Sequence, residues 1–356
     1  MELLADYGLF LAKAVTIVLA IGVTAALIAA LGQRQRGDHD GRIEVRRVND
    51  RYRDLAEALN DATLDPAERK VLRKSEEKRR KKEDKEKARA AKKQAKAGAD
   101  ARGERRPRLF VLDFDGDIRA SAVSELREEV SVLLGELSDS DEVLLRLESA
   151  GGLVHSYGLA ASQLRRIRDR GCRLTVAVDK VAASGGYMMA CVGQEIVAAP
   201  FAVIGSIGVL AQLPNFHRLL KKNDIDFELV TAGEYKRTLT LFGENTDKGR
   251  EKFREEIEDT HQLFKDFVGE MRPVVDIDRV ATGEVWYGQR ALDVGLIDAL
   301  ETSDAWLLAR LDSHDVFEVS YLPHKNWQQK LGLAAESAIE RVLLRAWELA
   351  SVRPKQ

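Results

Sequence analysis

Strand-like and helix-like segments alternate from Pro107 to about residue 300, and this alternation constrains the fold more than any other feature of the sequence. Short apolar runs predict strands at residues 109–114, 143–147, 174–178, 195–198 and 227–230. Longer segments predict helices at residues 120–137, 156–168, 184–191 and 247–271, with a final segment at 280–300. Such alternation is typical of an α/β domain built around a largely parallel sheet.

An apolar run near the N-terminus predicts a membrane-spanning helix. Residues 14–31 contain no charged side chain, and about 20 apolar residues are enough to cross a bilayer. A cleaved signal peptide would carry basic residues before its apolar core, whereas Glu2 and Asp6 come first here. We therefore expect residues 1–32 to be a retained anchor in contact with membrane lipid. Arginines follow the run, which favours a cytoplasmic position for the rest of the chain.

Residues 33–106 are predicted to be a charged connector, helical or disordered. The whole chain has a net charge of only −2, yet residues 69–106 hold 18 Lys or Arg against 7 Asp or Glu. A solvated helix or tether explains this segment better than a lipid-binding patch, because the interspersed acids dilute the positive charge. No aromatic residue interleaves the basic run, so we expect no nucleic-acid partner.

Two helices are expected within the connector. The first is amphipathic and carries its apolar residues at helical spacing: Val48, Tyr52, Leu55 and Leu59. Pro66 is suited to the first turn of the second, which runs to about residue 96. The α/β domain is then expected over residues 107–312, followed by a C-terminal extension, 313–356, with an amphipathic helix at 334–349.

Three glycine-rich segments are candidates for chemistry because each combines small residues with a need for close backbone approach. They are residues 149–152 (SAGG), 182–187 (AASGGY) and 204–208 (IGSIG). Glycine pairs at strand ends let backbone N–H groups turn toward a ligand, and a following helix start adds a positive dipole. We expect N–H groups of Gly151 or Gly152 and of Gly185 to form an oxyanion hole. Each segment alone is weak evidence, since a Ser before Gly-Gly is more often a helix N-cap than a nucleophile.

A nucleophile at Ser184 would need a general base. His155 and His217 are the histidines closest to these loops in sequence, but neither has an obvious carboxylate to orient it, so a Ser-His-Asp triad finds no support. Lysine replaces histidine where burial lowers its pKa toward neutrality. Lys236 lies among apolar residues that would desolvate it. The residues alone do not distinguish it from an ordinary surface lysine.

The sequence gives no sign of a metal or of another cofactor. Its six histidines lack the spacing of metal ligands. We expect Cys172 and Cys191 to be buried free thiols, with a disulfide between them as the alternative.

Residues 143–300 resemble the signal peptide peptidase A family of Ser-Lys peptidases, and most closely its SohB branch. The matching motifs are LESAGG, KVAASGGYMMA, APFAVIGSIGV, AGEYKRTLT and GREKFREEIEDTHQLFKDFV, in the family's order. The resemblance implies that Ser184 attacks the peptide carbonyl, that Lys236 takes its proton and that Ser206 hydrogen-bonds the lysine. It also implies that the LESAGG loop supplies an oxyanion donor.

The same resemblance implies a fold, an assembly and a substrate class. The fold would consist of repeated ββα units like those of the Clp protease and crotonase superfamily. The chain would form ring-shaped homo-oligomers, in which serine and lysine can come from neighbouring protomers. Substrates would be remnant signal peptides or other unfolded polypeptides at the bacterial inner membrane, and the family allows either face of it. One departure is Ala150, where the family has proline; a looser turn is expected, with no loss of an N–H donor.

Two rival functions are compatible with parts of this pattern. A crotonase-like acyl-CoA enzyme would share the fold and the oxyanion hole but needs carboxylates nearby, and only Glu148 lies close in sequence. A membrane scaffold or chaperone-like module with a vestigial site is the other. The joint presence of Ser184, Lys236 and Ser206 argues against such decay.

Overall fold

The computed structural model describes residues 41–97 and 106–323 and builds them around one sheet. The strand order is β1-β10-β2-β3-β4-β6-β9, while β5 branches from β3 and leads through β7 to β8. The strands are β1 (Arg42–Arg47), β2 (Arg108–Gly116), β3 (Glu142–Ser149), β4 (Arg173–Val178), β5 (Val181–Ala183), β6 (Glu195–Ala198), β7 (Val203–Gly205), β8 (Val285–Tyr287), β9 (Ala299–Leu300) and β10 (Asp315–Leu322). Strands β2 to β7, β9 and β10 pair in parallel and β8 pairs antiparallel with β7, which confirms the prediction of a largely parallel sheet.

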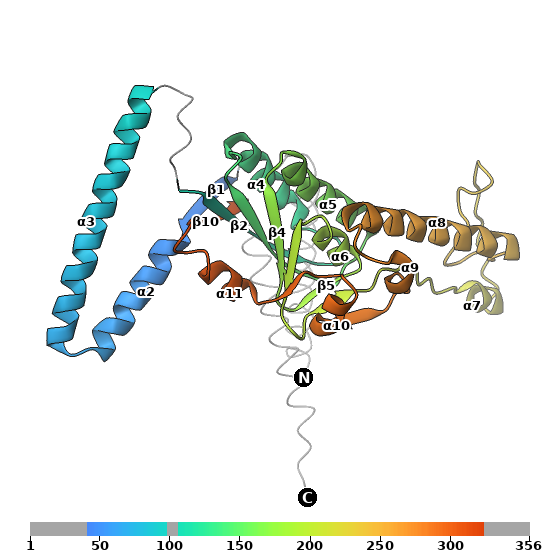
Figure 1. The fold of residues 1–356 in the computed structure, drawn as a ribbon. Helices are drawn as coiled ribbons and strands as arrows, with labels where there is room; N and C mark the ends of the chain where they lie inside the picture. The colour runs from blue at the N-terminus through green and yellow to red at the C-terminus, as the bar shows by residue number, and fades with distance from the viewer. Residues whose placement is uncertain (1–40, 98–105, 324–356) are drawn as a thin grey trace, which may run out of the picture. The chain divides into compact units, whose positions relative to one another are not determined.

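Helices cover both faces of the sheet (Figure 1). They are α2 (Val48–Thr63), α3 (Pro66–Ala97), α4 (Val123–Glu136), α5 (Val154–Asp169), α6 (Gly185–Ala190), α7 (His217–Lys222), α8 (Asp247–Met271), α9 (Ile277–Val280), α10 (Gly288–Asp293) and α11 (Ser303–Leu308). Helices α4, α5, α6 and α8 contribute to the larger apolar cluster, whereas α11 and the start of α2 contribute to a smaller one on the other face.

Strand β3 illustrates why these segments form a central sheet. Its sequence, EVLLRLES, sends Val143, Leu145 and Leu147 into the larger cluster and Leu144 into the smaller one, because successive side chains point to opposite faces. Near-continuous apolar runs of this kind are what a parallel strand covered on both faces requires.

The connector helices form where they were predicted. The buried side chain of Val48 and the half-buried side chain of Tyr52 pack against the sheet, while Leu55 and Leu59 remain exposed. Pro66 begins α3, where its missing N–H costs no hydrogen bond. The amphipathic part of the connector therefore belongs to the folded domain.

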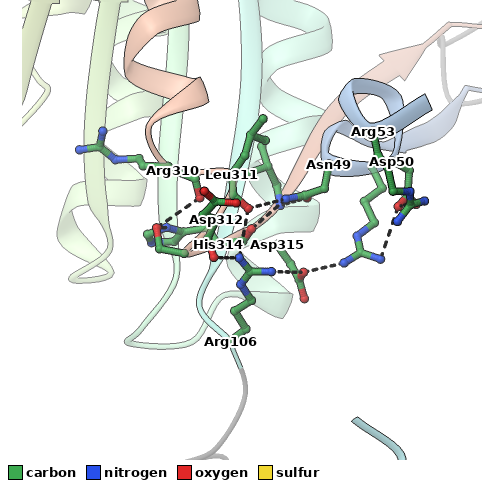
Figure 2. Close-up of polar contacts among 12 residues, drawn as sticks. Asn49, Asp50, Arg53, Arg106, Arg310, Leu311, Asp312, His314 and Asp315 are labelled. Atoms are coloured by element: carbon green, nitrogen blue, oxygen red, sulfur yellow. Dashed lines mark hydrogen bonds and ion pairs between the residues drawn. The ribbon is translucent and has the colours of Figure 1, made fainter. Parts of the chain in front are cut away.

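Strand β1 and the start of α2 attach the connector to the sheet edge, as Figure 2 shows. Asn49 donates its amide to the carbonyls of Leu311 and His314, both at 3.0 Å. Arg47, at the end of β1, forms a 2.6 Å ion pair with Asp315, at the start of β10. The end of β1 thus lies beside the start of β10, and because the two strands are also hydrogen-bonded neighbours, they run antiparallel.

The sheet extends beyond the predicted domain limits of 107–312. Strand β10 pairs in parallel with β2, with Asp315 opposite Arg108, so the start of the predicted C-terminal extension is an inner strand of the sheet, next to the edge strand β1. Strand β1 was not predicted, because its sequence, RIEVRR, is mostly charged, as is usual for an exposed sheet edge.

The strand predicted at residues 227–230 is absent from the described structure. These residues lie in an irregular, exposed segment between α7 and α8. Phe227 packs on Phe242, with ring centroids 5.8 Å apart, instead of entering the sheet. The apolar run was wrongly read as a strand because its composition is strand-like, although no strand of the domain pairs with it.

Two predicted helices lie outside the described residues: the membrane span at 14–31 and the C-terminal amphipathic helix at 334–349. Among the residues that are described, no helix is both long enough and apolar enough to span a bilayer.

Candidate active site

The three glycine-rich segments lie side by side in the fold. Strands β3, β5 and β7 are parallel neighbours, with Ser149 opposite Ala182 and Ala183 opposite Gly205. The segments therefore leave the carboxyl ends of adjacent strands, which is where open α/β sheets bind ligands. Three separate motifs in the sequence become one site.

Ser184 has a backbone conformation that is uncommon for a residue with a side chain. Its φ of 53° and ψ of −120° fall outside the regions favoured by non-glycine residues. Its N–H donates to the carbonyl of Gly205 at 2.7 Å, which fixes the turn between β5 and α6. Although Ser184 occupies the N-cap position of α6, its hydroxyl makes no capping hydrogen bond to that helix. Strain of this kind is characteristic of functional sites, and an ordinary N-cap does not explain it.

Ser206 lies next to Ser184 and is strained in a similar way. It directly follows β7, as Ser184 directly follows β5, so the two serines sit at neighbouring strand ends. Its φ is 51°, and its N–H donates to the carbonyl of Glu284 at 2.7 Å. Both serine side chains are half-buried.

The glycines of residues 151–152 approach the Ser184 turn closely. Gly151 has φ 89°, and a methyl group on it would come within 2.7 Å of the Gly185 nitrogen. Its own N–H donates to the Ser149 hydroxyl at 3.1 Å, so this N–H points into the loop. The N–H groups of Gly152 and Gly185 have no acceptor among the described residues. Of the three glycines predicted for an oxyanion hole, these two have the free donors.

A small pocket opens beside the Ser184 turn. It is lined by Gly152, Val154, Ser184, Gly185, Met188, Gly208, Val209, Thr260 and Phe264. Apolar side chains predominate, so the pocket is suited to a small apolar side chain of a ligand. His261, next to Thr260 on α8, places its Nε2 3.2 Å from the Ile207 carbonyl and so ties α8 to the Ser206 segment.

Lys236 is not brought to Ser184 by any contact within the described residues. It lies in an exposed turn where its N–H donates to the Gly233 carbonyl at 3.2 Å. The neighbouring side chains Glu234 and Tyr235 interact with α8 instead: Lys248 pairs with Glu234 at 2.5 Å, and Lys252 lies 5.4 Å from the Tyr235 ring centroid. The predicted role of Lys236 remains a prediction.

Carboxylate, thiol and metal chemistry have little support from the described residues around Ser184. The side chain of Glu148 is paired with Lys180 at 2.8 Å, which does not favour it as the free carboxylate of a crotonase-like enzyme. Burial raises the pKa of the Cys172 thiol to about 11 and also raises that of Cys191; both cysteines are buried and free, as predicted. Across the described ranges, no group of three or more His, Cys, Asp or Glu side chains is placed to hold a metal ion.

The sequence reasoning missed two residues that hold this site together. Tyr157 and Ser149 are both buried and hydrogen-bonded to each other at 2.5 Å. Ser149 opens the SAGG motif and so could have been found, whereas Tyr157 has the pattern of an ordinary core residue of α5.

Comparison with known proteins decides the family. The profile of the N-terminal region of peptidase family S49 matches residues 2–164, and that of peptidase family S49 itself matches residues 166–315. A probable protease SohB from Haemophilus influenzae is 49% identical over 97% of this chain and 96% of its own length. The chain belongs to peptidase family S49. The predicted family, including its SohB branch, is thereby confirmed.

Two further relatives of this S49 peptidase carry the same description. Probable proteases SohB from two Buchnera aphidicola subspecies are similar to it. The protein from Buchnera aphidicola subsp. Schlechtendalia chinensis is 47% identical over 87% of this chain and 100% of its own length. The protein from Buchnera aphidicola subsp. Acyrthosiphon pisum is 53% identical over 67% of this chain and 71% of its own length. Ser184, Ser206 and Lys236 fall within the S49 match, whereas residues 149–152 fall within the N-terminal match, and the fold joins the two regions at one site.

Proposed function

We propose that this S49 peptidase is a membrane-anchored serine endopeptidase with a Ser-Lys dyad. Ser184 is the nucleophile, Lys236 the general base, and Ser206 the hydroxyl that holds the lysine. Its substrates are signal-peptide remnants or other unfolded polypeptides near the bacterial inner membrane. The observation that carries this proposal is Ser184 itself, a strained serine that caps nothing and is surrounded by free N–H donors.

The proposed mechanism is acyl transfer to Ser184. Lys236, as the neutral amine, takes the hydroxyl proton of Ser184 while the serine oxygen attacks the substrate carbonyl carbon. The carbonyl oxygen becomes an oxyanion between the N–H groups of Gly152 and Gly185. The amine product leaves with a proton from Lys236, and water then hydrolyses the acyl-enzyme by the same route. The apolar pocket beside Ser184 receives the side chain before the cleaved bond.

As a general base, Lys236 needs to be more buried from solvent than it is in a single chain. A lysine acts as a base near neutral pH only when burial disfavours its charge, and Lys236 is exposed here. The segment around it also exposes large apolar side chains: Leu210, Leu213, Phe216, Leu219, Ile225, Phe227, Leu229, Val230, Tyr235, Leu241 and Phe242. Apolar surface on this scale is typical of a protein interface. We infer that a second copy of the chain covers it, in the ring-shaped oligomer that the family resemblance implies.

The finer fold and the location belong to the same proposal. Branching of β5 from β3, with β7 paired to β5, supports repeated ββα units of the Clp protease and crotonase type. Residues 14–31 are proposed as the anchor because of their apolar sequence. A reporter fused to the C-terminus, active on one side of the membrane only, would establish which face carries the domain.

The dyad is tested by hydrolysis of casein and of a signal peptide. Ser184→Ala and Lys236→Ala are expected to lower kcat by at least about 10³-fold, and Ser206→Ala by about tenfold. Ser162→Ala, an exposed serine of α5, and Lys222→Ala, an exposed lysine of α7, are the controls. A fluorophosphonate probe is expected to label Ser184 in the oligomer. Equal turnover by wild type and both dyad variants would instead support the scaffold or chaperone-like function.

A further inference from the structure

A chain of hydrogen bonds runs beneath the proposed oxyanion hole. Tyr157 is fully buried in the first turn of α5, and its hydroxyl donates to the Asp117 carbonyl at 2.7 Å. The same hydroxyl lies 2.5 Å from the Ser149 oxygen, which accepts the N–H of Gly151 at 3.1 Å. Side chains thus connect the end of β2, the end of β3 and the glycine pair.

Proton counts and distances together give the direction of this chain. A tyrosine hydroxyl has one proton, and Tyr157 gives it to Asp117. The Ser149 hydroxyl has two acceptors within reach, the Tyr157 oxygen at 2.5 Å and the Gly116 carbonyl at 3.3 Å, and the shorter distance assigns its proton to Tyr157. Its oxygen then accepts from Gly151. Every bond then points the same way, from the Gly151 N–H to the Asp117 carbonyl, an arrangement in which each bond strengthens the next. Burial also raises the pKa of Tyr157, which keeps its proton in place.

The chain holds the peptide that carries the Gly152 donor. On one side, the Gly151 N–H is fixed to Ser149; on the other, the Leu153 N–H is fixed to the Ile118 carbonyl at 2.8 Å. The peptide between Gly151 and Gly152 lies between these two fixed points, so its N–H direction is set by them.

The ring of Tyr157 supports the second donor. It packs so closely under Gly185 that a methyl group there would overlap the ring atoms. One side chain therefore touches both halves of the proposed hole, the Gly185 turn through its ring and the Gly152 loop through its hydroxyl.

We propose that Tyr157 is the positioning residue of the oxyanion hole, which it acts on through Ser149 and Gly185 without touching substrate. This inference rests on the proposed function. It predicts that loss of the hydroxyl weakens binding of the transition state more than binding of the substrate.

The test compares Tyr157→Phe with Tyr187→Phe in the full-length protein. Tyr187 is a matched control, because it is equally buried and its hydroxyl also donates to a main-chain carbonyl, that of Leu296, at 2.9 Å. Both variants are expected to lower the thermal midpoint similarly. Tyr157→Phe should in addition lower kcat about tenfold with KM within about twofold, a smaller loss than outright removal of one oxyanion donor. Tyr187→Phe should leave kcat near the wild-type value.

A peptide aldehyde gives a readout that a purely structural role would not move. The Ser184 oxygen bonds to the aldehyde carbon, its proton passes to the base, and the aldehyde oxygen becomes an oxyanion in the hole. Its inhibition constant should rise by the same factor as kcat falls in Tyr157→Phe. The inhibition constant of the matching peptide amide, which forms no oxyanion, should stay unchanged.

Ser149→Ala breaks the same chain without altering the ring and is expected to reproduce the effect. If Tyr157→Phe folds poorly, this variant carries the test. An active wild type with equal kcat in the Tyr157, Ser149 and Tyr187 variants would overturn the role of Tyr157 alone. A wild type whose hydrolysis does not depend on Ser184 would overturn the proposed function and this inference with it.

Discussion

Ser184 keeps a backbone conformation that costs of order 1–3 kcal/mol, and the rest of the fold must offset that cost. The Ser184 N–H donates to the Gly205 carbonyl. Gly151 lies so close to the Ser184 Cβ that a side chain at position 151 would overlap it. The conformation turns the serine out of the N-cap geometry and into the cleft between the glycine loops. Function and stability are thus opposed at this one residue.

This opposition gives a stability prediction. Ser184→Gly should be more stable than Ser184→Ala by about 1 kcal/mol, because glycine adopts positive φ without steric cost. At Ser162, in the middle of α5, the order should reverse, since glycine is disfavoured in helices by about 1 kcal/mol relative to alanine. Chemical denaturation of the four variants measures both differences. The same order at both positions would contradict strain at Ser184.

At the residue scale, the motifs predicted which loops lie together. Glycine pairs after strands identified the loops, and the fold confirmed that they meet. The choice between Gly151 and Gly152 could not be made in advance, because it depends on where the Ser149 hydroxyl points. The role of Tyr157 could not be predicted for the same reason. It depends on the strand register that brings Ser149 and the Asp117 carbonyl within hydrogen-bond distance of the Tyr157 hydroxyl.

At the element scale, α4 and β10 are joined by a buried carboxyl. Glu129, 5% exposed on α4, accepts the backbone N–H of Tyr321 at 2.8 Å, near the end of β10. Burial disfavours its charged form and raises its pKa from 4.5 to about 7. Between these values the folded chain holds a proton that the unfolded chain has released. The unfolding free energy therefore falls as pH rises through this window and does not recover above it.

Glu129→Gln should remove this loss while keeping an oxygen for the Tyr321 N–H. The variant is expected to gain stability relative to wild type as pH rises from 4.5 to 7, by at most about 3 kcal/mol. Urea denaturation at a series of pH values measures it, with Glu128→Gln, an exposed neighbour on α4, as the control. Parallel pH curves for wild type and Glu129→Gln would rule out this titration.

Helices were predicted better than edge strands. Periodicity and Pro66 located α2 and α3, and α8 was predicted with its observed bounds. The wrong predictions concern segments whose strand formation depends on pairing with a neighbour and not on the local sequence pattern. Strand β1 is mostly charged and still pairs, whereas residues 227–230 are apolar and form no strand. A strand exists only if a neighbour completes its hydrogen bonds, and a neighbour distant in sequence leaves no local signal.

At the scale of the whole molecule, the exposed apolar segment before α8 carries the proposed base. If a second copy covers it, the base of one chain serves the nucleophile of another. Chains with Ser184→Ala and with Lys236→Ala, each inactive, should then regain about a quarter of wild-type activity when assembled together in equal amounts, because one interface in four pairs both intact residues. Hydrolysis by co-refolded mixtures measures this. Mixtures as inactive as their components would place the dyad within one chain.

The pairing of β1 with β10 determines where the chain enters and leaves the domain. Continuing the observed register of β10 on β2 puts Leu322 opposite Asp115, level with the end of β3. Antiparallel β1 begins beside that end, at Arg42. Entry through β1 and exit through β10 therefore lie at the end of the sheet that carries the glycine-rich loops. They are three and two strand spacings, or about 15 Å and about 10 Å, from Ser149.

That position bears on where the proposed anchor would attach. An extended chain from Leu31 to Arg42 spans at most about 40 Å, so the proposed anchor at residues 14–31 would keep Arg42 within about that distance of the lipid surface. Under the proposal of an N-terminal anchor, the tether would thus start from the same end of the sheet as the glycine-rich loops.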